Sequence, residues 1–157
     1  MNGGADAAEQ DLAAAASALL DQGQCADRLS RPITAASAIV LLLLPAFLGP
    51  PPVLPTTILA LVVLLGLAEL YFAIRVGFDA ALFRRLAVAP DGFDRARLDR
   101  ALSRLGLMPE AKTGRPIIER VAGARRLLAW QGMTLVVQFL LVLIGAGLSA
   151  ALGRSAG

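Results

Sequence analysis

Two long apolar blocks without a charged residue dominate the pattern of this chain. The first runs from residue 32 to residue 68 and the second from residue 127 to residue 153. Crossing the hydrocarbon core of a bilayer takes about 20 helical residues, so the first block has room for two crossings and the second for one. The pattern therefore predicts an all-α integral membrane protein with three transmembrane helices.

Prolines divide the first block into a helical hairpin. Pro32 suits the first turn of a helix, and Pro45 should bend or end that helix near its far side. The segment GPPPVLP, residues 49–55, cannot continue a helix. We therefore expect a transmembrane hairpin over residues 32–75, with spans at about 32–48 and 56–75, and a third span over residues 127–152 followed by a short tail, 153–157.

The segment before the hairpin, residues 1–31, predicts an alanine-rich helix over residues 6–29 with acidic residues in its first turn. Those acidic residues stand where an export signal needs positive charge, so the segment is not expected to be a signal peptide. One face carries leucine and alanine and is expected to lie on the membrane surface or to dock on a partner helix; a frayed tail is the alternative. The residues of this face are Leu12, Ala16, Leu19 and Leu20.

The segment between the second and third spans, residues 76–126, is basic. The stretch 91–109 predicts a short amphipathic helix, and a second helical run begins at Pro116 and leads into the third span. Arginines beside a cytoplasmic leaflet attract anionic headgroups, whereas a leucine stripe favours a protein partner; packing on the chain's own bundle is the simpler alternative. The candidate lipid or partner contacts are Arg84, Arg85, Leu98, Leu102, Leu105, Arg125 and Arg126.

The distribution of positive charge predicts the orientation. Of 15 Lys and Arg residues, eleven lie between residues 76 and 126, and the proline turn has none. By the positive-inside rule the N-terminus and the basic segment are cytoplasmic, and the C-terminus is extracytoplasmic. The heavy use of Ala, Leu, Arg and Gly further suggests the cytoplasmic (inner) membrane of a bacterium, with a multi-pass topology.

Composition narrows the chemistry that the chain can perform. It is 57% hydrophobic with a mean hydropathy of +0.67, has no histidine and has one cysteine, Cys25. The absence of histidine removes the commonest metal ligand and the usual acid–base group near neutral pH. The sequence also contains no catalytic motif. We expect no enzyme activity, no catalytic residue, no cofactor and no metal. Nucleic-acid binding is not expected either, because acidic residues are interspersed among the basic ones.

Four polar residues within the apolar spans are the candidate functional side chains: Glu69, Gln131, Thr134 and Gln138. Placing an ionisable side chain inside a membrane span costs free energy, and such residues are often functional. Glu69 is therefore expected either to pair structurally with Arg126 or Gln131, or to carry a proton or substrate. The other three lie at i, i+3 and i+7 and are expected to face another helix.

These features favour a small accessory or scaffold subunit of a larger membrane assembly. A small oligomeric transporter or proton-linked carrier using Glu69 is one alternative, and a membrane regulator that binds a soluble partner through its cytoplasmic segment is another. The expected partners are anionic headgroups at the cytoplasmic face and another membrane protein or a second copy of the chain.

Overall fold

The structure is a computed structural model that describes residues 3–48, 53–89, 95–104, 106 and 115–155. These residues form helices joined by short connections, with no strand among them, so the all-α prediction is confirmed. The helices are α1 (Gly3–Asp21), α2 (Gly23–Leu48), α3 (Val53–Ala87), α4 (Arg95–Arg104) and α5 (Ile117–Ser155).

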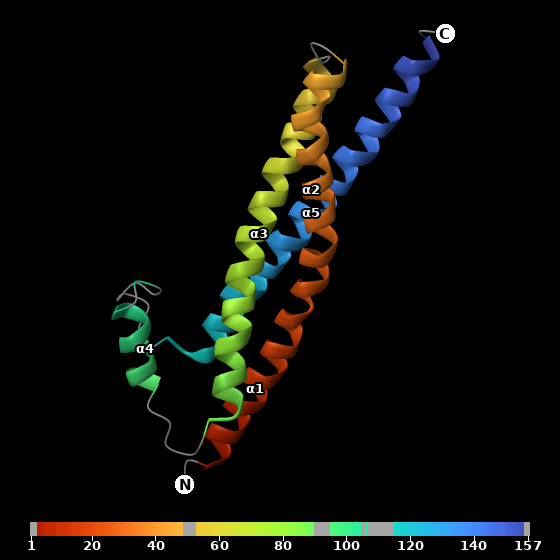
Figure 1. The fold of residues 1–157 in the computed structure, drawn as a ribbon. Helices are drawn as coiled ribbons and strands as arrows, with labels where there is room; N and C mark the ends of the chain where they lie inside the picture. The colour runs from red at the N-terminus through yellow and green to blue at the C-terminus, as the bar shows by residue number, and fades with distance from the viewer. Residues whose placement is uncertain (1–2, 49–52, 90–94, 105, 107–114, 156–157) are drawn as a thin grey trace.

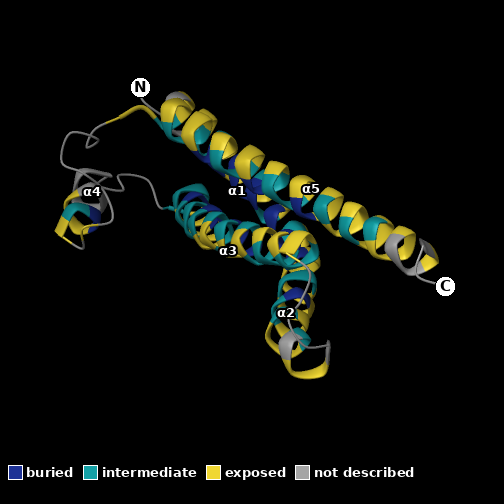
Figure 2. Ribbon diagram, turned by 90° about the horizontal axis from the view of Figure 1, so that it is seen from above, coloured by how far each residue is buried: buried dark blue, intermediate teal, exposed yellow. Residues whose placement is uncertain are grey.

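Helix α3 is the centre of the fold, because α1, α2 and α5 all pack against it. Helices α1 and α2 follow one another along α3, so that together they cover most of its length (Figure 1). Helix α5 crosses this pair at an angle and diverges from α2 towards its C-terminus, while α4 stands to one side of the other helices (Figures 1 and 2). The two chain ends lie at opposite ends of the molecule (Figure 1).

The half of the molecule near the N-terminus has an ordinary hydrophobic core. One face of α1 packs between the C-terminal part of α3 and the N-terminal part of α5. Small alanines on α1 and α5 let these helices approach the larger side chains of α3, as in water-soluble bundles. The buried residues of this core are Ala13, Ala16, Leu20, Val76, Ala80, Phe83 and Ala124. We call this set the lower core.

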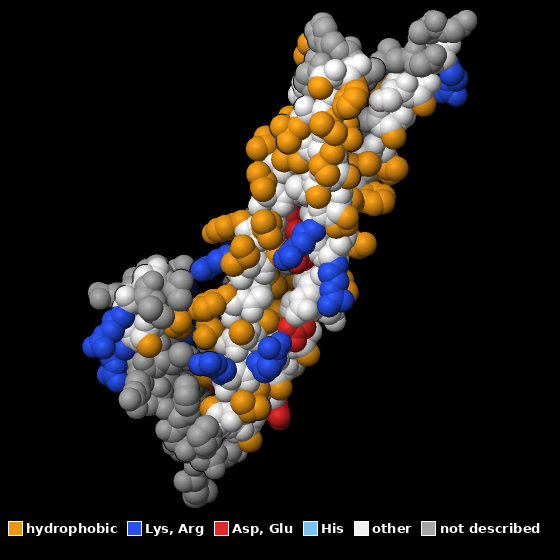
Figure 3. All heavy atoms as spheres, in the orientation of Figure 1, with side chains coloured by type: hydrophobic (Ala, Val, Ile, Leu, Met, Phe, Trp, Pro, Cys, Tyr) orange, Lys and Arg blue, Asp and Glu red, His pale blue; other side chains and the backbone are white. Residues whose placement is uncertain are grey.

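The other half has the opposite arrangement of polar and apolar side chains. Large apolar side chains such as Leu42, Phe47 and Leu64 are 61–78% exposed, and apolar side chains cover this half of the surface in Figure 3. Polar side chains lie inside instead. An exposed apolar surface of this extent marks a site of contact with lipid or with another protein.

Two described helices, α3 and α5, are long and apolar enough to cross a membrane. Helix α2 is not one of them. Its apolar part, residues 32–48, is at the lower end of the range of 17 to 25 residues that a crossing needs. The count of three spans therefore stays a prediction.

Several helix ends differ from those expected. The predicted helix over residues 6–29 is divided at Gln22, and α2 begins at Gly23, runs through Pro32 and continues past Pro45 to Leu48. Helix α3 begins at Val53, before the position expected, because Pro55 fits its first turn. Pro32 and Pro45 therefore neither begin nor end a helix. Helix α2 packs against α3, and this packing supports a continuous helix.

The segment 76–126 is less of a loop than expected. Helix α3 continues to Ala87 and α5 already begins at Ile117, in agreement with a helical run that leads into the third span. Helix α4 occupies only Arg95–Arg104 of the expected stretch, and Gly106 follows with a φ of 67°. This left-handed conformation after a helix suits glycine, because it carries no Cβ.

Candidate functional site

Polar side chains from three helices are buried together in the apolar half of the molecule. Glu69 of α3 is 1% exposed, and Gln131 and Gln138 of α5 are 0% exposed. Ser30 and Ser37 of α2 are buried too. Because buried polar groups are costly unless they are hydrogen-bonded, their partners show what holds these helices together. We call Ser30, Thr34, Glu69, Gln131 and Gln138 the polar core.

Gln138 joins all three helices of the polar core. Its Oε1 accepts a hydrogen bond from Ser30 Oγ at 2.8 Å, and its Nε2 donates to Thr34 Oγ1 at 2.8 Å. The same Nε2 donates to the Val62 carbonyl oxygen of α3 at 3.3 Å. The expected contact between Gln138 and another helix is therefore present, with two helices instead of one.

Gln131 makes the second connection between the three helices. Its Nε2 donates to Glu69 Oε1 at 2.8 Å and to the carbonyl oxygen of Gly23, the first residue of α2, at 2.9 Å. The expected contact between Glu69 and Gln131 is thus present. The alternative partner, Arg126, is exposed, and within the described part of the chain no cation lies within salt-bridge distance of Glu69.

Two glycines permit the close approach on which these hydrogen bonds depend. A Cβ on Gly66 would overlap the side chain of Thr34, which shows how closely α2 and α3 meet. A Cβ on Gly23 would lie 2.7 Å from Gln131 Oε1. Small residues at such crossings let helix backbones approach within reach of short polar side chains.

A seven-residue spacing connects the polar core along each helix. Gln131 and Gln138 are seven residues apart on α5, as are Val62 and Glu69 on α3. Residues seven apart are about two turns apart on the same face of a helix, so each helix presents two contacts to its neighbours on one face. Gly23 and Ser30 of α2 were not among the candidate residues, although they share the same spacing and, with Ser37, form a row of small residues.

A charged pair on α2 lies beside the polar core. Arg31 Nη2 is 2.7 Å from Asp27 Oδ2, and Arg31 Nε donates to Asp27 Oδ1. This hydrogen bond, together with the charge of Asp27, raises the pKa of Arg31 above its usual value. The two charges therefore compensate one another at the outer surface of α2.

The remaining candidates do not join the polar core. Thr134 Oγ1 donates to the carbonyl oxygens of Trp130 and Gln131 in its own helix. Leu102 is buried, the side chain of Leu98 is not described, and Leu105 lies outside the described residues. Arg85, Arg125 and Arg126 are exposed and remain candidates for headgroup contacts.

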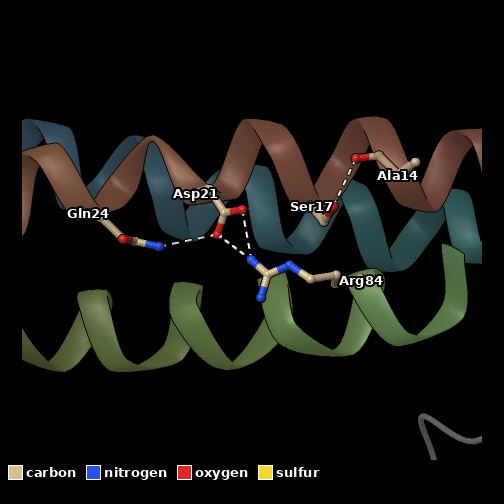
Figure 4. Close-up of polar contacts among 5 residues, drawn as sticks. All are labelled: Ala14, Ser17, Asp21, Gln24 and Arg84. Carbon is tan, nitrogen blue, oxygen red and sulfur yellow. Dashed lines mark hydrogen bonds and ion pairs between the residues drawn. The ribbon is translucent and has the colours of Figure 1, made fainter. Parts of the chain in front are cut away.

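Arg84, which was expected to contact lipid or a partner, contacts α1. Its Nη2 donates to both carboxylate oxygens of Asp21 at 2.8 Å, and Asp21 also accepts from Gln24 (Figure 4). An arginine whose charge is paired in this way is less available to an anionic headgroup. This ion pair links the end of α1 to α3, and Arg84 remains exposed.

A groove between α2 and α5 is lined only by apolar side chains: Leu29, Leu135, Val136, Phe139 and Leu140. Its volume is about 260 Å³.

Among the described residues no group of three or more His, Cys, Asp or Glu side chains is placed to hold a metal ion. Comparison with protein-family models, with curated proteins and with solved structures found no match.

Proposed function

We propose that this chain is a multi-pass protein of a bacterial inner membrane and serves as an accessory or scaffold subunit of a larger membrane assembly. The observation that carries the proposal is the use of the polar core. The amides of Gln131 and Gln138 both connect α5 to α2 and α3. Polar groups committed to holding helices together support a structural role for the bundle.

The outer surface of α5 supports the same proposal. Side chains such as Phe139, Leu140 and Leu143 are 52–57% exposed, and only 6% of the residues in the most apolar stretch of this helix are fully buried. Helix α5 also diverges from α2 towards its C-terminus (Figure 1). A long apolar helix with so little of its surface covered by its own chain has room for a helix of another subunit.

Site-specific crosslinking from α5 tests the proposal. A photoreactive amino acid at Leu143 should crosslink to one discrete partner chain in native membranes, and gentle detergent extraction should recover the same partner. The matched control places the photoreactive group at Leu128 of the same helix, whose side chain packs against the lower core, and should yield only intramolecular products. Crosslinks from position 143 to lipid alone, or only to a second copy, would argue against an accessory subunit and, in the second case, favour an oligomeric carrier.

The proposed orientation gives a separate prediction. We propose that the N-terminus and the segment 76–126 are cytoplasmic and that the C-terminus is extracytoplasmic, with α2 as a third span. A compartment-sensitive reporter fused after Gly157 should be active only outside the cytoplasm, because eleven positive residues hold segment 76–126 inside. A reporter inserted near residue 112 should be active only inside. If both report the same compartment, α5 does not cross the membrane and the third span is wrong.

A further inference from the structure

The contacts between Glu69 and Gln131 are short of one hydrogen-bond donor. The amide nitrogen of Gln131 donates to Glu69 Oε1 and to the Gly23 carbonyl oxygen, which uses both of its N–H groups. Two acceptors are left over, Glu69 Oε2 and Gln131 Oε1, and both are buried without a hydrogen-bond partner. A buried acceptor without a partner is uncommon in a native structure.

Nearby charged groups do not supply the missing donor. On α2, Arg31 is paired with Asp27 at 2.7 Å. On α5, Arg125 and Arg126 are exposed, and on α3 the nearest cation in sequence, Arg75, lies six residues beyond Glu69, or about 9 Å along a helix axis. The Ser30 hydroxyl also lies near the Glu69 carboxyl, but it donates its proton to Gln138 Oε1. An ionised Glu69 would thus be buried without an ion-pair partner, an arrangement that proteins avoid.

We propose that Glu69 and Gln131 form a proton-binding site. The ligand is a single proton taken from water, which converts the Glu69 carboxylate into a neutral carboxylic acid with the proton on Oε2. The O–H group then donates to Gln131 Oε1, while Gln131 Nε2 donates to Glu69 Oε1. The acid and the amide are joined by two hydrogen bonds, and both leftover acceptors are satisfied without any additional ligand.

The site couples proton occupancy to helix packing. With the proton bound, α3 and α5 are joined by a neutral, fully hydrogen-bonded pair, and Gln131 keeps its contact with Gly23 of α2. When the proton leaves, a negative charge and two unpaired acceptors remain in the same buried space. We therefore expect the contact between α2, α3 and α5 to loosen on deprotonation.

Infrared spectroscopy of the full-length protein in lipid vesicles tests the site directly. At neutral pH the wild-type protein should show the C=O stretch of a protonated carboxyl group, and labelling with [13C]glutamate should shift that band. The band should disappear in Glu69→Gln, whose amide keeps a donor for Gln131 Oε1 and should preserve the fold. It should persist in the matched control Glu119→Gln, because Glu119 is exposed on the same long helix as Gln131.

A second variant tests the hydrogen bond itself. In Gln131→Leu the protonated carboxyl loses its acceptor, so the band should move to higher frequency while it remains sensitive to glutamate labelling. The proposal is overturned if the wild-type protein lacks the band at neutral pH, or if the band survives unchanged in Glu69→Gln. An unchanged frequency in Gln131→Leu would show that Glu69 does not donate to Gln131.

Discussion

Phe83→Ala should destabilise the lower core more than any other single truncation, by about 3–5 kcal/mol, the usual cost of removing a buried aromatic side chain. Phe83 is 4% exposed and lies in a cluster whose other buried members are mostly alanines. These small neighbours cannot move enough to fill the space that the ring leaves. We expect the thermal unfolding temperature in detergent to fall and the amides of α1 to exchange with solvent faster.

The matched control is Phe139→Ala, which removes the same ring from a position that is 54% exposed on α5. It should leave the exchange of α1 unchanged, since Phe139 lies in the apolar groove and not in the lower core. Equal protection of α1 in the wild-type protein and in Phe83→Ala would show that the lower core does not hold α1 in place.

Gly66→Ala should separate α2 from α3 and destabilise the protein by about 1–3 kcal/mol, the range for overpacking a well-packed contact. The added methyl group would overlap the side chain of Thr34, which itself accepts a hydrogen bond from Gln138. The substitution therefore disturbs the polar core as well as the local packing. The expected result is a lower unfolding temperature and less monodisperse protein after extraction.

Gly77→Ala provides the control on the same helix. No atom lies within 4 Å of a Cβ at position 77, and alanine is favoured over glycine in a helix by about 1 kcal/mol. This variant should be as stable as the wild-type protein or more so. If Gly66→Ala behaves in the same way, α2 and α3 do not meet as closely in solution as the structure indicates. Thr34→Ala added to Gly66→Ala should restore part of the lost stability.

The sequence predicts the features of this fold that depend on long-range apolar pattern. The all-helical class, the helical run from Pro116 into the third apolar block and the contact between Glu69 and Gln131 all follow from blocks and spacings that extend over many residues. The predicted contact between Gln138 and another helix follows from the cost of leaving an amide unpaired in an apolar surrounding.

Features set by packing between distant segments could not be predicted in this way. Pro32 and Pro45 suggest helix boundaries, yet α2 passes through both. An interior proline removes one backbone hydrogen bond, and the contacts that α2 makes with α3 are not visible in the sequence. Arg84 is an exposed cation in the structure too, but its ion pair with Asp21 of α1 could not be predicted, because the two residues lie far apart in the sequence. Gly23 and Ser30 belong to no motif in the sequence. Their role is seen only in the structure, where they form hydrogen bonds with Gln131 and Gln138.

Helix α5 continues without a break from the lower core to the far end of the molecule, so a change in its tilt at one end displaces the other end. Its 39 residues correspond to a rod of about 58 Å at 1.5 Å per residue. A tilt of about five degrees at the lower core would move the opposite end by roughly 5 Å, since a helix of this length bends little. A partner that tilts α5 at the lower core would therefore displace the surface that α5 presents at the opposite end of the molecule.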